Sequence, residues 1–151
     1  MALWQWLVDS AGALLLLVLV YGLLLVVRRR WLSRHGGTFE LSHRVRSSST
    51  GRGWVLGLGR YSDGTLEWFR IFSPSPRPRR RWDRTQLRLV GQRAPSGSES
   101  LALYAGHVVV ECRSDHGTTV ELAMSPSALT GFQSWLEARP PGTNWSQAPV
   151  R

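Results

Sequence analysis

Residues 11–27 read AGALLLLVLVYGLLLVV, carry no charge, and are followed directly by RRR at positions 28–30. At about 1.5 Å per residue, a helix over this stretch is roughly 25 Å long, slightly less than the ~30 Å hydrocarbon core of a bilayer. Apolar residues before the stretch and Trp31 after it extend the run. Tryptophan favours the headgroup level, because its ring is apolar and its N–H needs a polar partner. The stretch therefore predicts one membrane-spanning helix.

The charges on either side of this helix predict its orientation. The N-terminal flank holds Asp9 and no Arg or Lys, whereas Arg28, Arg29, Arg30 and Arg34 follow the apolar run. Positive residues are retained in the cytoplasm, so the long C-terminal part is expected inside and the N-terminus outside. We expect a single-pass protein of the plasma (inner) membrane.

Two alternatives to a membrane anchor fit this segment less well. A cleaved signal peptide fits poorly, because the charged n-region is missing and RRRW stands where a small-residue cleavage site is expected. A buried core helix fits less well, because the run is apolar on every face. We expect an anchor over residues 1–32, one domain over 33–139 and a disordered tail over 140–151.

Positive charge is concentrated near the membrane. All 19 basic residues are Arg, and residues 28–93 contain 16 of them against four acidic residues. Each Arg close to an anionic leaflet contributes about 1 kcal/mol of attraction. Nucleic acid is the other polyanion that such a chain could bind, but a membrane anchor favours lipid. The sole cysteine, Cys112, excludes an intramolecular disulfide.

The remainder of the chain predicts a mainly β domain. An Asp63-Gly64 pair between two alternating runs predicts a two-residue hairpin with a type I′ turn. Rows of alternating apolar residues, among them Val108, Val110 and Cys112, are expected to point inward. The seven short strands are expected at 38–45, 54–61, 65–72, 85–92, 101–104, 108–113 and 118–124.

A helix is expected after the last strand. Ser125 is a good N-cap, Pro126 suits the first helical position, and Leu129, Phe132 and Leu136 recur with helical spacing. Seven antiparallel strands followed by one helix resemble the pleckstrin-homology-like fold, a bent barrel or sandwich closed by its last helix. The prediction is therefore a mainly β domain of this kind behind one N-terminal transmembrane helix.

Three segments together resemble a known family: RRRWLSRHGGTFE, GWVLGLGRYSDGTLEWFRIFSPSPRPRRR and ELAMSPSALTGFQSWLEARPPG. They are similar to domain-of-unknown-function family 2550, an actinobacterial family of small single-pass membrane proteins, over most of the chain. Members are often encoded beside ATP synthase genes, so the resemblance implies a bioenergetic context. It implies no activity and no residue role.

Residues 73–84, SPSPRPRRRWDR, form the most distinctive local segment. Proline prevents strand pairing, and the Arg side chains are expected to bind lipid phosphates or a partner while Trp82 sits at the headgroup boundary. A solvated basic loop is the alternative. The membrane- or partner-binding candidates are Arg28, Arg29, Arg30, Trp31, Arg34, Arg77, Arg79, Arg80, Arg81, Trp82 and Arg84.

The pleckstrin-homology resemblance implies weaker lipid candidates in the first strands, where phosphoinositide-binding members hold their basic residues. These are Arg44, Arg46, Arg52 and Arg60.

Catalytic and cofactor signatures are weak. The glycines at 51–59 fail the dinucleotide pattern, and we expect Gly57 and Gly59 to let a strand bend. His107, Cys112 and His116 lack a fourth ligand, and no nucleophile elbow occurs. We expect no enzyme, cofactor, metal or small-molecule substrate, but a noncatalytic protein that docks on anionic lipid and on a membrane-protein partner. A ligand-binding or enzymatic barrel and a nucleic-acid-binding domain are the alternatives.

Overall fold

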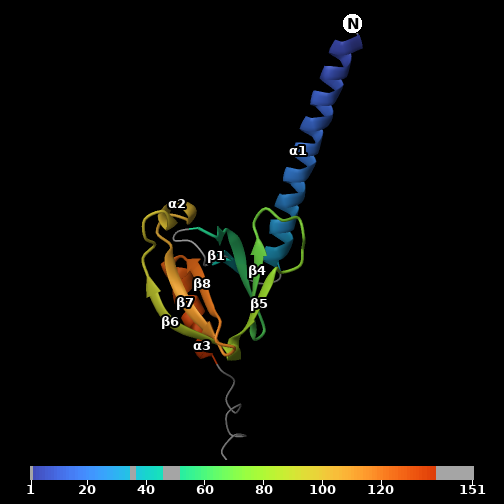
Figure 1. The fold of residues 1–151 in the computed structure, drawn as a ribbon. Helices are drawn as coiled ribbons and strands as arrows, with labels where there is room; N and C mark the ends of the chain where they lie inside the picture. The colour runs from blue at the N-terminus through green and yellow to red at the C-terminus, as the bar shows by residue number, and fades with distance from the viewer. Residues whose placement is uncertain (1, 35–36, 46–51, 139–151) are drawn as a thin grey trace, which may run out of the picture.

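The computed structural model describes residues 2–34, 37–45 and 52–138 of the chain (Figure 1). Helix α1 (Ala2–Arg34) is continuous and projects from a β domain, with its last turns beside strand β4 (Thr65–Arg70). It is long and apolar enough to cross a membrane. It ends beyond the predicted anchor boundary at residue 32, and the predicted tail lies outside the described residues.

The domain is one antiparallel sheet of eight strands in the order β5-β4-β3-β1-β8-β7-β6, with β2 paired to β1. The coarse prediction of an N-terminal helix, an antiparallel sheet and a C-terminal helix is confirmed. The remaining strands are β1 (Thr38–Arg44), β2 (Trp54–Val55), β3 (Gly57–Ser62), β5 (Arg80–Asp83), β6 (Leu87–Arg93), β7 (Val108–Ser114) and β8 (Thr119–Met124).

Strand β1 joins the two halves of the sheet. Its first residues pair with β3, and Leu41, Ser42 and His43 pair with β8 on the other side. The β1–β2 pairs keep the register of the β1–β3 pairs. Strands β2 and β3 therefore correspond to the single strand predicted at 54–61, which the structure interrupts at Leu56. Because β1 belongs to both halves, the sheet folds around it and encloses a core.

The core lies between the two halves and is closed by helix α3 (Pro126–Glu137). Trp68, Phe132 and Leu122 are at most 1% exposed within it. The predicted inward row of β7 is confirmed, as are the cap at Ser125, whose Oγ accepts from Ala128 N at 3.2 Å, and Pro at the helix start. Helix α3 lies at the end of the domain opposite the free part of α1 (Figure 1).

Four expectations are corrected. The sheet is not closed into a barrel: β5 and β6 are its two ends, and α3 packs beside β6. Residues 101–104 are not a strand; helix α2 (Glu99–Ala102) ends there, because the Glu99 carboxylate accepts from Ser96 N and starts a turn. Residues 80–83 form β5, because they follow the last proline and keep their N–H groups for pairing. Of the two central turn residues, Asp63 alone has a positive φ, 50°, so the turn is not type I′.

Gly57, the first residue of β3, is required for packing. A methyl group at this position would overlap the Trp68 indole and the Phe69 carbonyl oxygen. The indole occupies this space because its Nε1 donates to Leu41 O at 2.8 Å inside the core. Gly59 similarly leaves room for Phe39 and Leu41.

We predict that Gly57→Ala lowers the free energy of unfolding by about 1–3 kcal/mol, because a rigid ring and a backbone oxygen must move. Gly131→Ala is the matched control: nothing lies within 4 Å of its added methyl group, and alanine favours the helix, so stability should rise by up to about 1 kcal/mol. Unfolding by urea in mild detergent measures both changes. Equal stability of the two variants would contradict this account.

Candidate functional site

One face of α1 is built into the domain. Tyr21, Leu25, Arg28 and Leu32 repeat at intervals of four, three and four residues, so they share one side of the helix. Arg28 is 9% and Leu32 1% exposed, whereas the neighbouring helix residues are exposed. An isolated helix cannot bury a leucine completely, so the domain covers this face. We call these four residues the docking stripe.

Hydrogen bonds attach the docking stripe to the segment between β4 and β5. Arg28 donates from Nε to Ser75 O at 2.8 Å and from Nη1 to Arg70 O at 3.2 Å. The Tyr21 hydroxyl donates to Phe72 O at 2.9 Å. Tyr21 precedes Arg28 by two helical turns, about 10 Å along the axis. The backbone at Phe72 therefore lies beside the apolar part of the helix.

A cleft of about 300 Å³ opens between the end of α1 and this segment. Its lining contains four arginines and two serines, and no carboxylate. Proline keeps the segment before Arg80 out of the sheet, as expected, and its Arg side chains surround the opening. We call this site the arginine cleft. It is lined by Arg28, Arg70, Ser73, Ser75, Arg77, Pro78 and Arg79.

The structure brings together Arg28, Arg77 and Arg79 among the predicted candidates, and Arg80 lines an adjoining hollow with Arg79. The same structure adds Arg70, which the sequence analysis missed. Arg70 is the last residue of β4, and in the sequence it is indistinguishable from a polar residue that simply ends a strand. Its position directly before the proline-rich segment is the signal that could have identified it.

Three candidates of the 73–84 segment contact other side chains of the domain. Arg81, whose side chain is 64% exposed, has its Nε atom 3.2 Å from the Glu67 carboxylate. The half-buried Trp82 ring packs against the core, 5.1 Å from the His43 ring, and this packing does not favour its predicted place at the headgroup boundary. Alternation along β5 turns this side chain inward. The Arg84 guanidinium lies over the Trp135 ring of α3, at the end of the domain opposite the free part of α1.

Two of the weaker candidates form ion pairs within the domain. The Arg44 side chain is 10% exposed and contacts Glu121 at 2.8 Å, and Arg60 contacts Glu67 at 2.6 Å. These ion pairs hold strands together and engage both guanidinium groups away from any lipid. Arg52 is exposed, and Arg46 lies outside the described residues.

Candidates on α1 remain at the surface. Arg29, Arg30 and Arg34 are exposed, and the Trp31 side chain is 52% exposed. They follow the apolar run directly, at the depth expected for headgroups. Arg28 alone among the helix arginines is buried by the domain.

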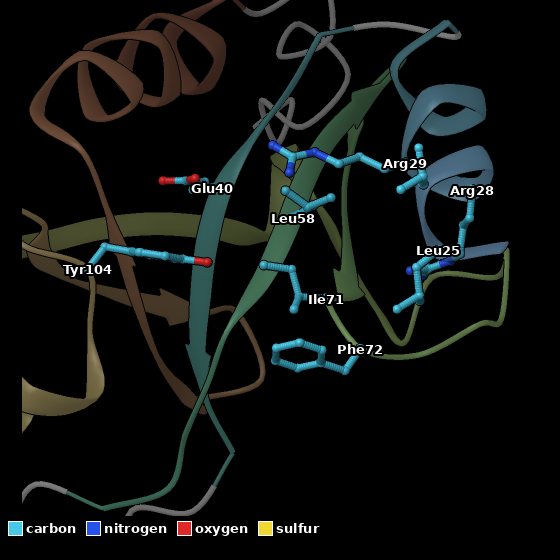
Figure 2. A pocket seen from close by; sticks show the side chains of 9 residues that line it. Leu25, Arg28, Arg29, Glu40, Leu58, Ile71, Phe72 and Tyr104 are labelled. Carbon is cyan, nitrogen blue, oxygen red and sulfur yellow. The ribbon is translucent and has the colours of Figure 1, made fainter. Parts of the chain in front are cut away.

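A second hollow of about 330 Å³ lies beside the cleft and is mainly apolar. Leu25 and Val26 of α1 line one side, and Ile71 and Phe72 line another (Figure 2). Arg29, Glu40 and Tyr104 provide its polar edge. The apolar surface of the helix therefore continues onto the domain.

The residues considered as metal ligands are separated. Cys112 is in the core, where burial raises the pKa of its thiol to about 12. His107 Nε2 lies 3.7 Å from Glu40, and His116 is exposed in the turn between β7 and β8. Nothing in this arrangement converges on a metal ion.

We predict that Arg28→Gln loosens the segment from 71 to 79, because two hydrogen bonds from a charged donor are lost. The local opening free energy should fall by about 1.5–3 kcal/mol, measured as faster backbone hydrogen exchange in that segment. Arg30→Gln, on an exposed helix position, should leave exchange unchanged. Unaltered exchange in Arg28→Gln would show that the domain is held by other contacts.

Glu99 generates a pH dependence. Hydrogen bonds from Arg93, at 2.6 and 3.0 Å, lower the pKa of its carboxyl from 4.5 to about 2. Its contribution to stability is therefore full above about pH 4.5 and lost as the pH falls toward 2. Wild type should exceed Glu99→Gln in thermal stability at neutral pH and converge with it in acid. The exposed Glu137→Gln is the control, and a gap that persists in acid would contradict the assignment.

Comparison with known proteins places the chain in a family. The model of the family described as protein of unknown function (DUF2550) matches residues 15–142. Uncharacterized protein Rv1312 of Mycobacterium tuberculosis (strain ATCC 25618 / H37Rv) is 37% identical over 132 residues, covering 84% of this chain and 89% of the relative. Uncharacterized protein ML1147 of Mycobacterium leprae (strain TN) is 34% identical over 115 residues, covering 74% and 78%. No solved structure matches the chain. The chain belongs to the DUF2550 family, as its motifs predicted.

Proposed function

We propose that this chain is a noncatalytic single-pass membrane protein whose domain docks on the anionic cytoplasmic leaflet and on a membrane-protein partner. The N-terminus lies outside and the domain inside, because arginines follow the apolar run of α1 and none precede it. The observation that carries the proposal is the docking stripe, since it fixes the domain to the end of a helix that can span a membrane.

The docking stripe also supports a retained anchor over a cleaved signal peptide. Removal of α1 would take away Leu32, which is 1% exposed, and the Arg28 bonds to Ser75 O and Arg70 O. The domain would then expose an apolar surface and two backbone carbonyls. A segment built into the folded domain in this way is a poor candidate for removal.

Exposed apolar side chains accompany the arginines. Among the described residues outside α1, Phe72 and Leu101 are the most exposed large apolar side chains, at 75% and 90%. Helix α2, which carries Leu101, and the segment after β4, which carries Phe72, both lie at the end of the domain from which α1 projects (Figure 1). Apolar residues beside cations suit an interface of acyl chains and phosphates.

The pleckstrin-homology-like architecture is part of the proposal. A four-stranded half and a three-stranded half meet where β1 pairs with β8, and α3 follows the last strand, which supports that relation. The partner is proposed to contact the face of α1 opposite the docking stripe, where residues such as Leu16 and Leu23 are exposed. The family resemblance suggests a bioenergetic context for this partner.

We predict that Phe72 reaches the acyl region of the bilayer. Cys112 is buried, so a Phe72→Cys variant can be labelled selectively with an environment-sensitive fluorophore in the full chain. In nanodiscs of phosphatidylcholine with phosphatidylglycerol, its emission should be blue-shifted and quenched by lipids that carry a quencher on the acyl chain. A label at Gln86→Cys, an exposed position near α3, is the control and should report water.

An emission maximum at position 72 that matches the fluorophore in water would contradict the docking proposal. Docking that survives high salt and the omission of phosphatidylglycerol would refute its electrostatic part, because screening weakens attraction to an anionic surface. Retention on DNA in place of vesicles would favour the nucleic-acid alternative.

A further inference from the structure

Arginines of this chain fall into two groups by their ion pairs. Arg44, Arg60 and Arg93 contact buried or half-buried carboxylates within the domain. The arginines of the cleft form no ion pair with any carboxylate in the described part of the chain, and no carboxylate lines the cleft. Four positive charges therefore converge on one cleft without an internal counterion. They are Arg28, Arg70, Arg77 and Arg79.

Arg70 carries an unpartnered donor beside the cleft. Its Nε atom is less than 1 Å² exposed and has no hydrogen-bond partner among the described residues. Burial of a donor without a partner is unfavourable, and more so when the donor carries charge. A small shift of the Arg70 side chain toward a phosphate oxygen in the cleft would give this donor a partner.

Arg28 is held in place as a second donor. Its Nε and Nη1 are bound to two backbone carbonyls, so the guanidinium plane is fixed before any ligand arrives. Its Nη2 has no hydrogen bond to the described residues, and the same side chain lines the cleft. Guanidinium groups pair with phosphate oxygens through two parallel N–H donors, which a single ammonium group cannot do.

The cleft lies where lipid phosphates are expected. Arg28 is the first residue after the apolar run. Phe72 lies next to the cleft, and its carbonyl oxygen accepts a hydrogen bond from the Tyr21 hydroxyl within that run. A volume of about 300 Å³ is at the lower end of small-ligand sites, which suits a headgroup. The adjoining apolar hollow at Leu25 and Phe72 provides a surface for the attached acyl chain.

We propose that the arginine cleft binds the phosphodiester of one anionic glycerophospholipid, with Arg28 as the donor held in place by the backbone and Arg70, Arg77 and Arg79 as further donors. This inference rests on the proposed membrane location and deepens it: docking becomes recognition of one lipid molecule. Each donor contributes N–H groups to phosphate oxygens, and the negative charge of the phosphodiester offsets part of the positive charge of the four arginines.

Native mass spectrometry of the full chain, released from detergent micelles, tests the cleft. Micelles are doped with phosphatidylglycerol, with phosphatidylcholine, or with inorganic phosphate alone. We expect one phosphatidylglycerol per chain, weaker retention of phosphatidylcholine, and no competition from inorganic phosphate. Arg70→Gln and Arg79→Gln should each weaken phosphatidylglycerol binding about tenfold, the loss expected for one charged hydrogen bond.

Two further variants separate geometry from charge and from folding. Arg70→Lys keeps the charge but loses the buried Nε donor, so it should not restore binding. Arg88→Gln changes an arginine whose side chain is 74% exposed and paired with Asp115, and it should bind as wild type. Arg79 is exposed, so its variant reports on the ligand even if Arg70→Gln folds poorly.

Wild-type binding by both Arg70→Gln and Arg79→Gln would overturn the proposal. Displacement by inorganic phosphate would identify a free-anion site, and equal retention of phosphatidylcholine would exclude an anionic headgroup; both contradict it. The label at position 72 is measured on the same variants. A variant that loses the lipid while its label stays at the same depth has lost the cleft but not membrane docking. A variant that keeps the lipid while its label moves into water has lost docking but not the cleft.

Discussion

The packing of four side chains of α1 against the β domain is the constraint on which the rest of the structure depends. Leu32 and Arg28 are buried by that contact, and Arg28 and Tyr21 bind the backbone of the segment after β4. Helix and domain are therefore one unit rather than an anchor and a tethered module. The position of every surface residue relative to a bilayer follows from this contact, including the exposed Phe72 beside the apolar run.

Charge is divided between stability and recognition. Glu67, Glu99 and Glu121 neutralise arginines of the sheet, where both partners are partly withdrawn from water. The arginines beside α1 have no such partners among the described residues and instead share a cleft without acidic groups. The carboxylates of the sheet thus stabilise the domain, while the surface beside α1 stays positive, and this positive surface is the basis of the proposed lipid site.

Much of the fold could be predicted from the sequence because its signals are local. The apolar run, the strand alternation and the Ser125-Pro126 helix start need no tertiary information. The structures of two segments depend on tertiary contacts that the sequence pattern does not show. Residues 80–83 form a strand because they pair with β4, and residues 101–104 do not, because the Glu99 side chain starts a turn just before them. The sequence predicts part of the cleft, because Arg77 and Arg79 stand in the distinctive proline- and arginine-rich segment. Arg70 lies outside that segment and reaches the cleft only through the fold. The ion pairs of Arg44 and Arg60 also depend on strand pairing, so composition alone cannot show that these arginines are paired.

The distance between helix and domain tests the central claim most directly. Spin labels at Leu17→Cys, an exposed position in the part of α1 beyond the domain, and at Gln86→Cys, near α3, report this distance by pulsed electron paramagnetic resonance in bilayers. A domain fixed by the docking stripe predicts one narrow distance distribution, which broadens when Leu32 is replaced by Asp. A broad distribution in the unaltered chain would mean that helix and domain move independently, and the account of the cleft at headgroup depth would be wrong.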